Sequence, residues 1–130
     1  CWGSNSNATR GVSYDTTTYS TVPMRIAGIS GAPALAVSAY SACAIIGSGA
    51  SSTVKCWGYA YFGDLGNGTT GGDNAPTPVT VCAVGQTDPC AGSLTGVTSI
   101  AAAASAITPH RSAAATAIRF RLVSNDPPSL

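Results

Sequence analysis

Glutamate is absent from this chain of 130 residues, and its five acidic side chains are all aspartates. Charged residues make up 8% of the sequence, against about 25% in a typical soluble domain. Because Glu, Lys and Arg usually cover exposed helices, their scarcity disfavours a helical bundle. Ala, Ser, Thr and Gly take their place, which is typical of closely packed β-structure with many turns. We therefore expect an all-β fold.

Basic charge and long apolar runs are also lacking, and each absence excludes a class of partner. The net charge of +1 provides no basic surface for a nucleic-acid backbone. No run of roughly 18 apolar residues occurs, so the sequence predicts no membrane span. Disorder is disfavoured as well, because the chain is 45% hydrophobic and can form a core.

Groups that carry catalysis or hold metals are few. His110 is the single histidine, and no Cys-x-x-Cys pair occurs, so acid–base catalysis and a zinc site are both disfavoured. Four oxygen-bearing side chains could together ligate Ca²⁺, although their spacing is not that of a known calcium loop: Asp64, Asn67, Asp73 and Asn74. We expect no enzyme, no cofactor and no resident metal.

The chain repeats itself with an offset of 55 residues. The triplet Cys-Trp-Gly occurs at residues 1–3 and again at 56–58, and the same offset places Gly11 on Gly66. Alternating apolar residues then predict a half-buried strand in both copies. Beyond this strand the register slips, because the second copy contains an insertion at 82–92. A period of about fifty residues with Gly-rich turns is typical of propeller blades or a similar array.

Each copy is predicted to contain four short strands. In the first copy these are 21–26, 33–38, 41–46 and 53–57, with glycine-rich turns between them. The alanine-rich run IAAAASA could form a helix, but its match to PALAVSA favours a strand. We divide the chain into a first repeat (1–55), a second repeat (56–104) with the inserted loop 82–92, and an atypical tail (105–130). The tail is either a natural cap or an out-of-frame end, and its TAIRFRLV run could pair as one edge strand.

Several motifs together resemble one repeat family. The run SACAIIGSGASSTVKCWGYAYFGDLGNGTT, followed by PTPVTV and LTGVTSIAA, is similar to the bacterial branch of the regulator of chromosome condensation repeat family. The resemblance implies a seven-bladed β-propeller of four-stranded antiparallel blades, of which this chain would form a partial propeller. The chain departs from the family at Asp64, where Gln is usual. It departs again at SNSNATRG in the first copy, which stands in place of the glycine-rich motif.

The five cysteines indicate an oxidising compartment. Cys43 and Cys56 flank the turn GSGASS on adjacent predicted strands, so we expect them to form a disulfide. A bridge between Cys82 and Cys90 would close the inserted loop. Cys1 takes the place of Cys56 in the first copy, so we expect its partner upstream of this excerpt. Buried free thiols are the alternative; with disulfides, the chain is expected to be secreted or at the cell surface.

Aromatic side chains gather in the connections that follow each Cys-Trp-Gly. Aromatics on loops of a rigid scaffold are typical of binding surfaces, although they could equally seal the interface between blades. Trp2 and Trp57 are expected to pack between blades. The candidate binding surface consists of Tyr14, Tyr19, Tyr59, Tyr61 and Phe62.

Three classes of function compete. The leading hypothesis is an extracellular, non-enzymatic propeller repeat module for protein–protein binding or scaffolding, next to the remaining blades of a parent chain. The second is a regulator of an enzyme, because the family resembled includes a nucleotide-exchange factor for a small GTPase and a secreted inhibitor of β-lactamases. A shared fold does not transfer either role. A hydrolase would need carboxylates at the blade tops, and the sequence lacks them.

Overall fold

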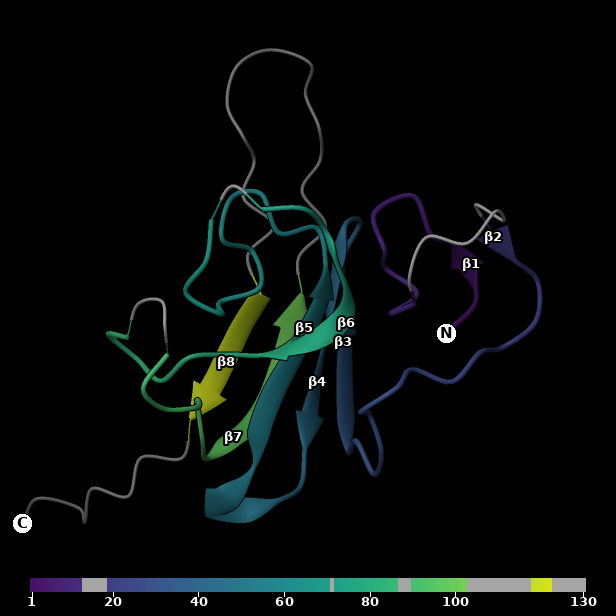
Figure 1. Cartoon of the computed structure of the whole chain (residues 1–130). Coiled ribbons are helices and arrows are strands. Elements are labelled where there is room, and N and C mark those ends of the chain that lie inside the picture. Colours follow the sequence, from purple (N-terminus) through teal and green to yellow (C-terminus); the bar gives the residue numbers. More distant parts are fainter. Residues whose placement is uncertain (13–18, 71, 87–89, 103–117, 123–130) are drawn as a thin grey trace, which may run out of the picture.

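The computed structural model describes residues 1–12, 19–70, 72–86, 90–102 and 118–122 (Figure 1). Within this part of the chain the helical structure is a single 3₁₀ turn, η1 (Gly49–Ser51), as the scarcity of helix-forming residues predicts. The all-β fold is therefore confirmed. The strands are β1 (Gly3–Ser4), β2 (Tyr19–Ser20), β3 (Ala34–Val37), β4 (Ser41–Ile46), β5 (Thr53–Gly58), β6 (Ala75–Thr80), β7 (Val97–Ala102) and β8 (Ile118–Leu122).

One four-stranded antiparallel sheet forms the centre of the molecule, with the strand order β3-β4-β5-β6. Its strands follow each other in the sequence, and η1 turns the chain from β4 into β5. Ser41 to Ile45 are all buried, so β4 is covered on both faces of the sheet. Small side chains such as Ala42 and Ala44 suit this position, because they let neighbouring elements approach closely.

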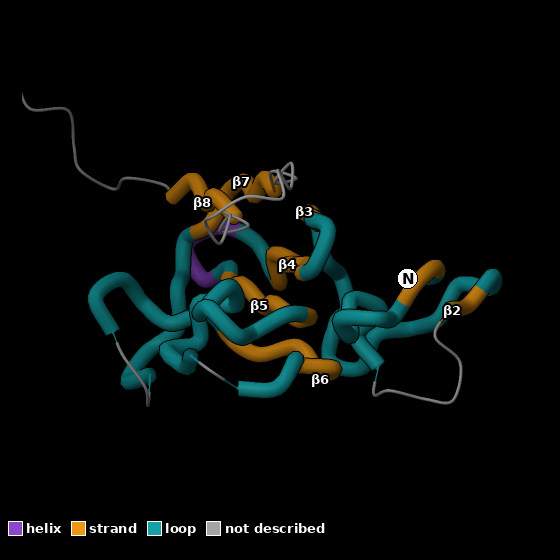
Figure 2. The backbone as a smooth tube through the Cα atoms, turned by 90° about the horizontal axis from the view of Figure 1, so that it is seen from above, coloured by secondary structure: helices purple, strands orange, loops and turns teal. Residues whose placement is uncertain are grey.

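Two smaller sheets, β1-β2 and β7-β8, lie on opposite sides of the central sheet (Figures 1 and 2). The strand β7 lies alongside β3 and β4, and β8 pairs antiparallel with β7. The described part of the alanine-rich run, which ends at Ala102, is thus a strand and not a helix. The TAIRFRLV run contributes the strand β8, and the rest of the tail lies outside the described residues.

Two hydrophobic clusters attach the central sheet to its neighbours. On one face, side chains of β4 and β5 pack against the first residue of β7 and against residues of the loops that precede it: Cys43, Ile45, Val54 and Cys56 against Leu65, Val81, Leu94 and Val97. On the other face, Ala42, Ala44 and Trp57 pack against Cys1, Ile26 and Ile29. The alternation of side chains along β4 and β5 separates the two clusters.

The offset of 55 residues is reproduced in the backbone pairing. Gly3 pairs with Ser20 in the first copy, and Gly58 pairs with Ala75 in the second. Likewise, the Met24 amide donates to the Cys1 carbonyl at 2.8 Å, where the second copy pairs Val79 with Cys56. The sequence repeat is therefore also a structural repeat.

The sequence predicts a strand at 21–26, and this prediction is wrong, because the structure forms no strand there. Its equivalent in the second copy lies largely within β6 and completes the sheet on β5. In the first copy the backbone of 21–26 hydrogen-bonds to Cys1 through Met24, and Val22 remains 66% exposed. The central sheet therefore joins β3, β4 and β5 to a strand from beyond the second Cys-Trp-Gly.

The loops after each Cys-Trp-Gly, 4–11 and 59–66, share one backbone course. Ala8 donates to the Asn5 carbonyl at 3.0 Å, and Gly63 donates to the Ala60 carbonyl at 3.2 Å. One turn further on, the Gly11 amide donates to the Ala8 carbonyl at 3.0 Å, and the Gly66 amide donates to the Gly63 carbonyl at 3.1 Å. Both glycines have positive φ, of +70° and +62°. The first loop therefore folds like the second, although only the closing glycine is common to both sequences.

Candidate functional site

Four aromatic rings form a surface cluster above the end of the central sheet, which we call the aromatic surface: Tyr40, Tyr59, Tyr61 and Phe62. Tyr59 is at its centre, with ring centroids 6.1 Å from Tyr40 and 6.1 Å from Phe62. Tyr61 and Phe62 meet edge to face at 5.0 Å. These are the separations that aromatic pairs favour. Tyr61 and Phe62 are nevertheless 53% and 57% exposed, so the cluster offers apolar area to solvent.

The β4–β5 hairpin positions this aromatic surface. Its pairing, which places Cys43 opposite Cys56, continues outward until the Tyr59 amide donates to the Tyr40 carbonyl at 2.8 Å. Sequence reasoning identified Tyr59, Tyr61 and Phe62 but missed Tyr40. Counting the hairpin outward from the cysteine pair would have found it, because residues equally far from a hairpin's turn lie opposite each other.

Gly58 permits the close approach of the two strands beneath the rings. Its φ is +111°, which side-chain-bearing residues rarely adopt. A Cβ atom at this position would lie 2.5 Å from the Tyr40 carbonyl oxygen and 2.8 Å from the Ser41 Cα. The glycine of Cys-Trp-Gly is therefore required by both the backbone conformation and the contact.

An open groove of about 560 Å³ runs beside the aromatic surface. Tyr59 and Tyr61 form one side, and the segment before and at the start of β6 forms the other, with Asp73, Asn74 and Pro76. The groove thus combines two aromatic faces with a carboxylate and an amide. This combination can bind an apolar side chain of a partner and hydrogen-bond to its backbone.

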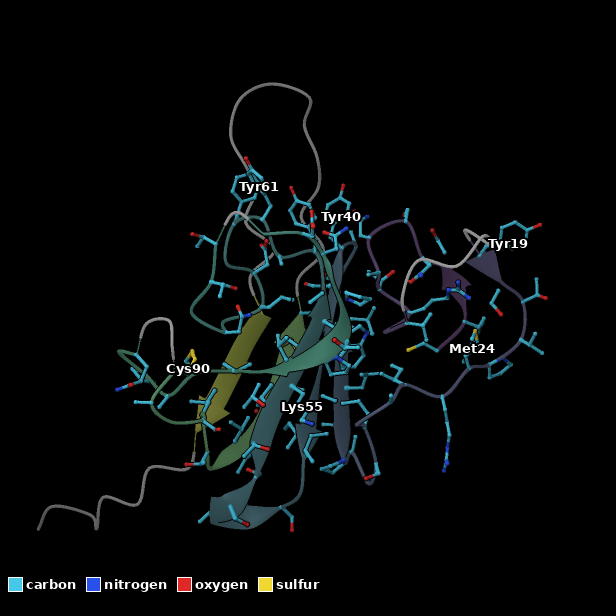
Figure 3. All side chains as sticks on the ribbon, viewed as in Figure 1. Tyr19, Met24, Tyr40, Lys55, Tyr61 and Cys90 are labelled. Atoms are coloured by element: carbon cyan, nitrogen blue, oxygen red, sulfur yellow. A yellow bond between two sulfur atoms is a disulfide. The ribbon has the colours of Figure 1, made fainter. Side chains whose placement is uncertain are left out.

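Of the two remaining predicted aromatics, the described one, Tyr19, does not join this surface. Tyr19 is on β2, away from Tyr40 and Tyr61 (Figure 3), and it is 67% exposed. It is separated because β2 pairs with β1 and not with the central sheet. Tyr14 lies outside the described residues. Of the predicted set of five, Tyr59, Tyr61 and Phe62 thus lie together, with Tyr40 added, whereas Tyr19 lies apart from them.

The two tryptophans differ, although both were expected to be packed. Trp57 is fully buried, and its Nε1 donates to the Thr9 carbonyl at 2.9 Å. This bond and the packing on Cys1, Ile26 and Ile29 join the segment 1–29 to the central sheet. Trp2, the equivalent residue of the first copy, is 68% exposed. The expectation is wrong for Trp2, because the described residues place no equivalent loop against its ring.

Both predicted disulfides are present. Cys43–Cys56 joins β4 to β5 with its Cα atoms 4.0 Å apart, inside the first hydrophobic cluster. Cys82–Cys90 closes the inserted loop, whose base is also held by the pairing of Cys82 with Ser93. Cys1 is a free, half-buried thiol.

Two of the four oxygen-bearing side chains considered for calcium, Asp64 and Asn67, are engaged locally. The Asp64 carboxylate accepts from the Phe62 amide at 3.4 Å, and the Asn67 side-chain oxygen accepts from the Thr69 hydroxyl at 2.9 Å. Such bonds to residues two positions away are those of ordinary polar turns. Among the described residues, no three His, Cys, Asp or Glu side chains come together as metal ligands would. His110 lies outside this part.

In the part of the chain that the structure describes, no helix has the length and hydrophobicity to cross a bilayer. Comparison with known proteins finds no family model that matches this chain, and neither a curated protein nor a solved structure that is similar to it.

Proposed function

We propose that this chain is a non-enzymatic, extracellular module of the β-propeller type, which binds a protein partner through the aromatic surface. The propeller arrangement is supported by the four-stranded antiparallel sheet and by the position of β7. The matched runs at Leu35 and Ile100 identify β3 and β7 as equivalent strands of consecutive repeats, and these strands lie side by side. Consecutive blades of a propeller approach each other in this way, so the remaining blades of a parent chain are proposed neighbours.

The observation that carries protein binding is the exposure of Tyr61 and Phe62 on a rigid support. The disulfide-bonded hairpin and Tyr59 hold both rings in place, so little conformational entropy is lost when a partner covers them. Aromatic side chains also carry a large share of binding energy in protein interfaces. The neighbouring groove with Asp73 and Asn74 supplies polar groups at the rim of such an interface.

The extracellular location is supported by the two disulfides. Structural disulfides persist in oxidising compartments and are rare in the cytosol. A bridge in the hydrophobic core, such as Cys43–Cys56, is part of the folded structure and not an exposed redox pair.

A comparison of matched variants tests the proposed binding surface. The wild-type chain is immobilised and exposed to the extracellular and cell-surface proteins of the organism that produces it. We expect a Tyr61→Ser, Phe62→Ser double variant to lose the captured protein, whereas Tyr19→Ser retains it. Tyr19 is the control because its side chain is at least as exposed as Tyr61 and Phe62 but lies elsewhere. Capture of the same proteins by the double variant would overturn the proposal.

A further inference from the structure

The groove beside the aromatic surface brings two tyrosine rings and a carboxylate to one space of about 560 Å³. Tyr59 is half-buried and Tyr61 is exposed, and their ring centroids are 6.4 Å apart with the planes inclined by 31°. Asp73, which is exposed in the segment before β6, borders the same space. The other described residues of the lining are uncharged: Gly72, Asn74 and Pro76.

The charge around this groove is negative. Asp64 adds a second carboxylate within the loop that carries the aromatic surface, where it accepts from the backbone amide two positions earlier. Two of the described cations are held elsewhere. Arg10 is buried, and the Lys55 amine donates to the Gly28 carbonyl at 3.3 Å, away from Tyr61 (Figure 3). As far as the structure describes it, the lining of the groove contains a negative charge and no positive one.

An arginine side chain of a partner would use every part of this lining. Its guanidinium is planar and cationic, so it stacks on aromatic rings and pairs with a carboxylate through two parallel hydrogen bonds. Its methylene stem is apolar and can lie along the tyrosine rings. An apolar side chain alone would cover the Asp73 carboxylate without giving it a partner, which costs free energy. Charge complementarity therefore favours a basic anchor over an apolar one.

We infer that the partner inserts an arginine side chain into this groove, where its guanidinium stacks on Tyr59 and Tyr61 and pairs with the Asp73 carboxylate. The inference rests on the proposed function, because it specifies the chemistry of the partner at the same surface. Phe62 does not line the groove, so it contacts an apolar residue next to that arginine. The recognised segment thus combines one cation with an apolar neighbour.

Selection from a phage-displayed library of random peptides tests the arginine anchor. The immobilised wild-type chain is expected to enrich peptides that share an arginine at one position, whereas the Asp73→Asn chain loses this preference. Asp64→Asn is the matched control and should keep the preference. It removes an equal charge from a carboxylate outside the groove lining, and its amide oxygen can still accept from Phe62. Enrichment of peptides without a shared arginine by the wild-type chain overturns the inference.

Titration of one enriched peptide separates the ion pair from the general charge of the surface. The comparison peptide carries citrulline, which has nearly the shape of arginine but no charge. Fluorescence anisotropy is expected to give a roughly 10-fold weaker dissociation constant for the citrulline peptide with the wild-type and Asp64→Asn chains. With the Asp73→Asn chain the two peptides should bind equally. If citrulline weakens binding to the Asp73→Asn chain as much as to the wild type, the arginine does not pair with Asp73, and the inference is overturned.

The arginine anchor and the proposed function fail through different results. Peptides that lack arginine but lose binding to the Tyr61→Ser, Phe62→Ser chain would overturn the anchor and still support the aromatic surface as a binding site. Arginine peptides that bind this double variant as tightly as the wild type would overturn both proposals. A library from which no peptide is enriched overturns the anchor, while the capture experiment still decides the proposed function.

Discussion

Two residues make contacts that a substitution would disrupt: Gly58 beneath the aromatic surface, and Ser52 in the turn next to β7. Gly58 combines a φ of +111° with backbone atoms where a Cβ would be. Ser52 is fully buried, and its hydroxyl donates to the Val97 carbonyl at 2.8 Å. Its own carbonyl accepts from Gly96 at 3.0 Å, so one residue holds the start of β7 at two points.

Gly58→Ala is expected to lower the free energy of unfolding by about 3 kcal/mol, because backbone strain and overpacking add at this position. Gly72→Ala is the control, since a Cβ there meets no atom within 4 Å and its φ is not positive. Urea denaturation of both variants measures the difference. A Gly58→Ala chain as stable as the Gly72→Ala chain would show that β4 and β5 do not approach as described.

Ser52→Ala is expected to destabilise the chain by about 1–2 kcal/mol, because the Val97 carbonyl loses a buried donor. Ser51→Ala removes a hydroxyl one position earlier that donates to the Ser48 carbonyl at the exposed surface, so it should be nearly neutral. Thermal unfolding of the pair provides the measurement. If the two variants melt together, the buried hydrogen bond does not hold β7.

At the scale of elements, the β4–β5 hairpin was the most predictable part of the fold. Two cysteines equally far from a glycine-rich turn define the register, and β4 matches its predicted bounds at Ser41–Ile46. The pairing of β5 with β6 was not predictable in this way, because a long loop separates them and no local pattern names the partner. The failure at 21–26 has the same cause, since an apolar alternation forms a strand only where a neighbouring strand is present.

The candidate site, like the fold, was predictable only in part. Composition and position in the loop identified Tyr59, Tyr61 and Phe62, whereas Tyr40 required knowledge of which residues face each other across the hairpin. Tyr19 was grouped with them because the two loops correspond in sequence. Correspondence between repeats does not mean proximity in space.

Removing the hairpin disulfide by Cys43→Ala and Cys56→Ala is expected to cost about 3 kcal/mol, the chain-entropy value for a loop of this length. The bridge spans 13 residues, whereas Cys82–Cys90 spans 8, so the corresponding double variant of the second pair should cost somewhat less. Chemical denaturation compares the two. Mass mapping of the wild-type chain under oxidising conditions is the accompanying check, and free thiols at Cys43 and Cys56 would contradict the extracellular proposal.

At the scale of the whole molecule, Trp57 couples the N-terminal segment 1–29 to the central sheet. Its ring packs on Cys1, Ile26 and Ile29, and its Nε1 binds the Thr9 carbonyl. The repeat seen in the sequence begins at Cys-Trp-Gly, but the sheet it builds begins at Ala34 and ends at Thr80. Periodicity defines the length of a unit but not the residue at which its sheet starts. The start of the sheet could therefore be identified only from the structure.

Trp57→Ala is expected to lower stability by about 3–5 kcal/mol, the cost of deleting a buried aromatic side chain. It should also release the segment 1–29, so that trypsin cleaves after the exposed Arg25 faster than in the wild-type chain. Trp2→Ala removes the equivalent, exposed ring and should change neither property. Unchanged cleavage at Arg25 in the Trp57→Ala chain would mean that other contacts hold the segment 1–29 in place.

The shared course of loops 4–11 and 59–66 separates the shape of a loop from the chemistry it displays. The positions of Tyr61 and Phe62 in one loop are those of Ser6 and Asn7 in the other, yet the same hydrogen bonds and the same closing glycine form both. A duplicated unit can thus gain or lose an aromatic patch by substitution at two outward positions, with its framework intact. Such a scaffold can diversify its recognition copy by copy, and it offers each loop as a graft site of known conformation.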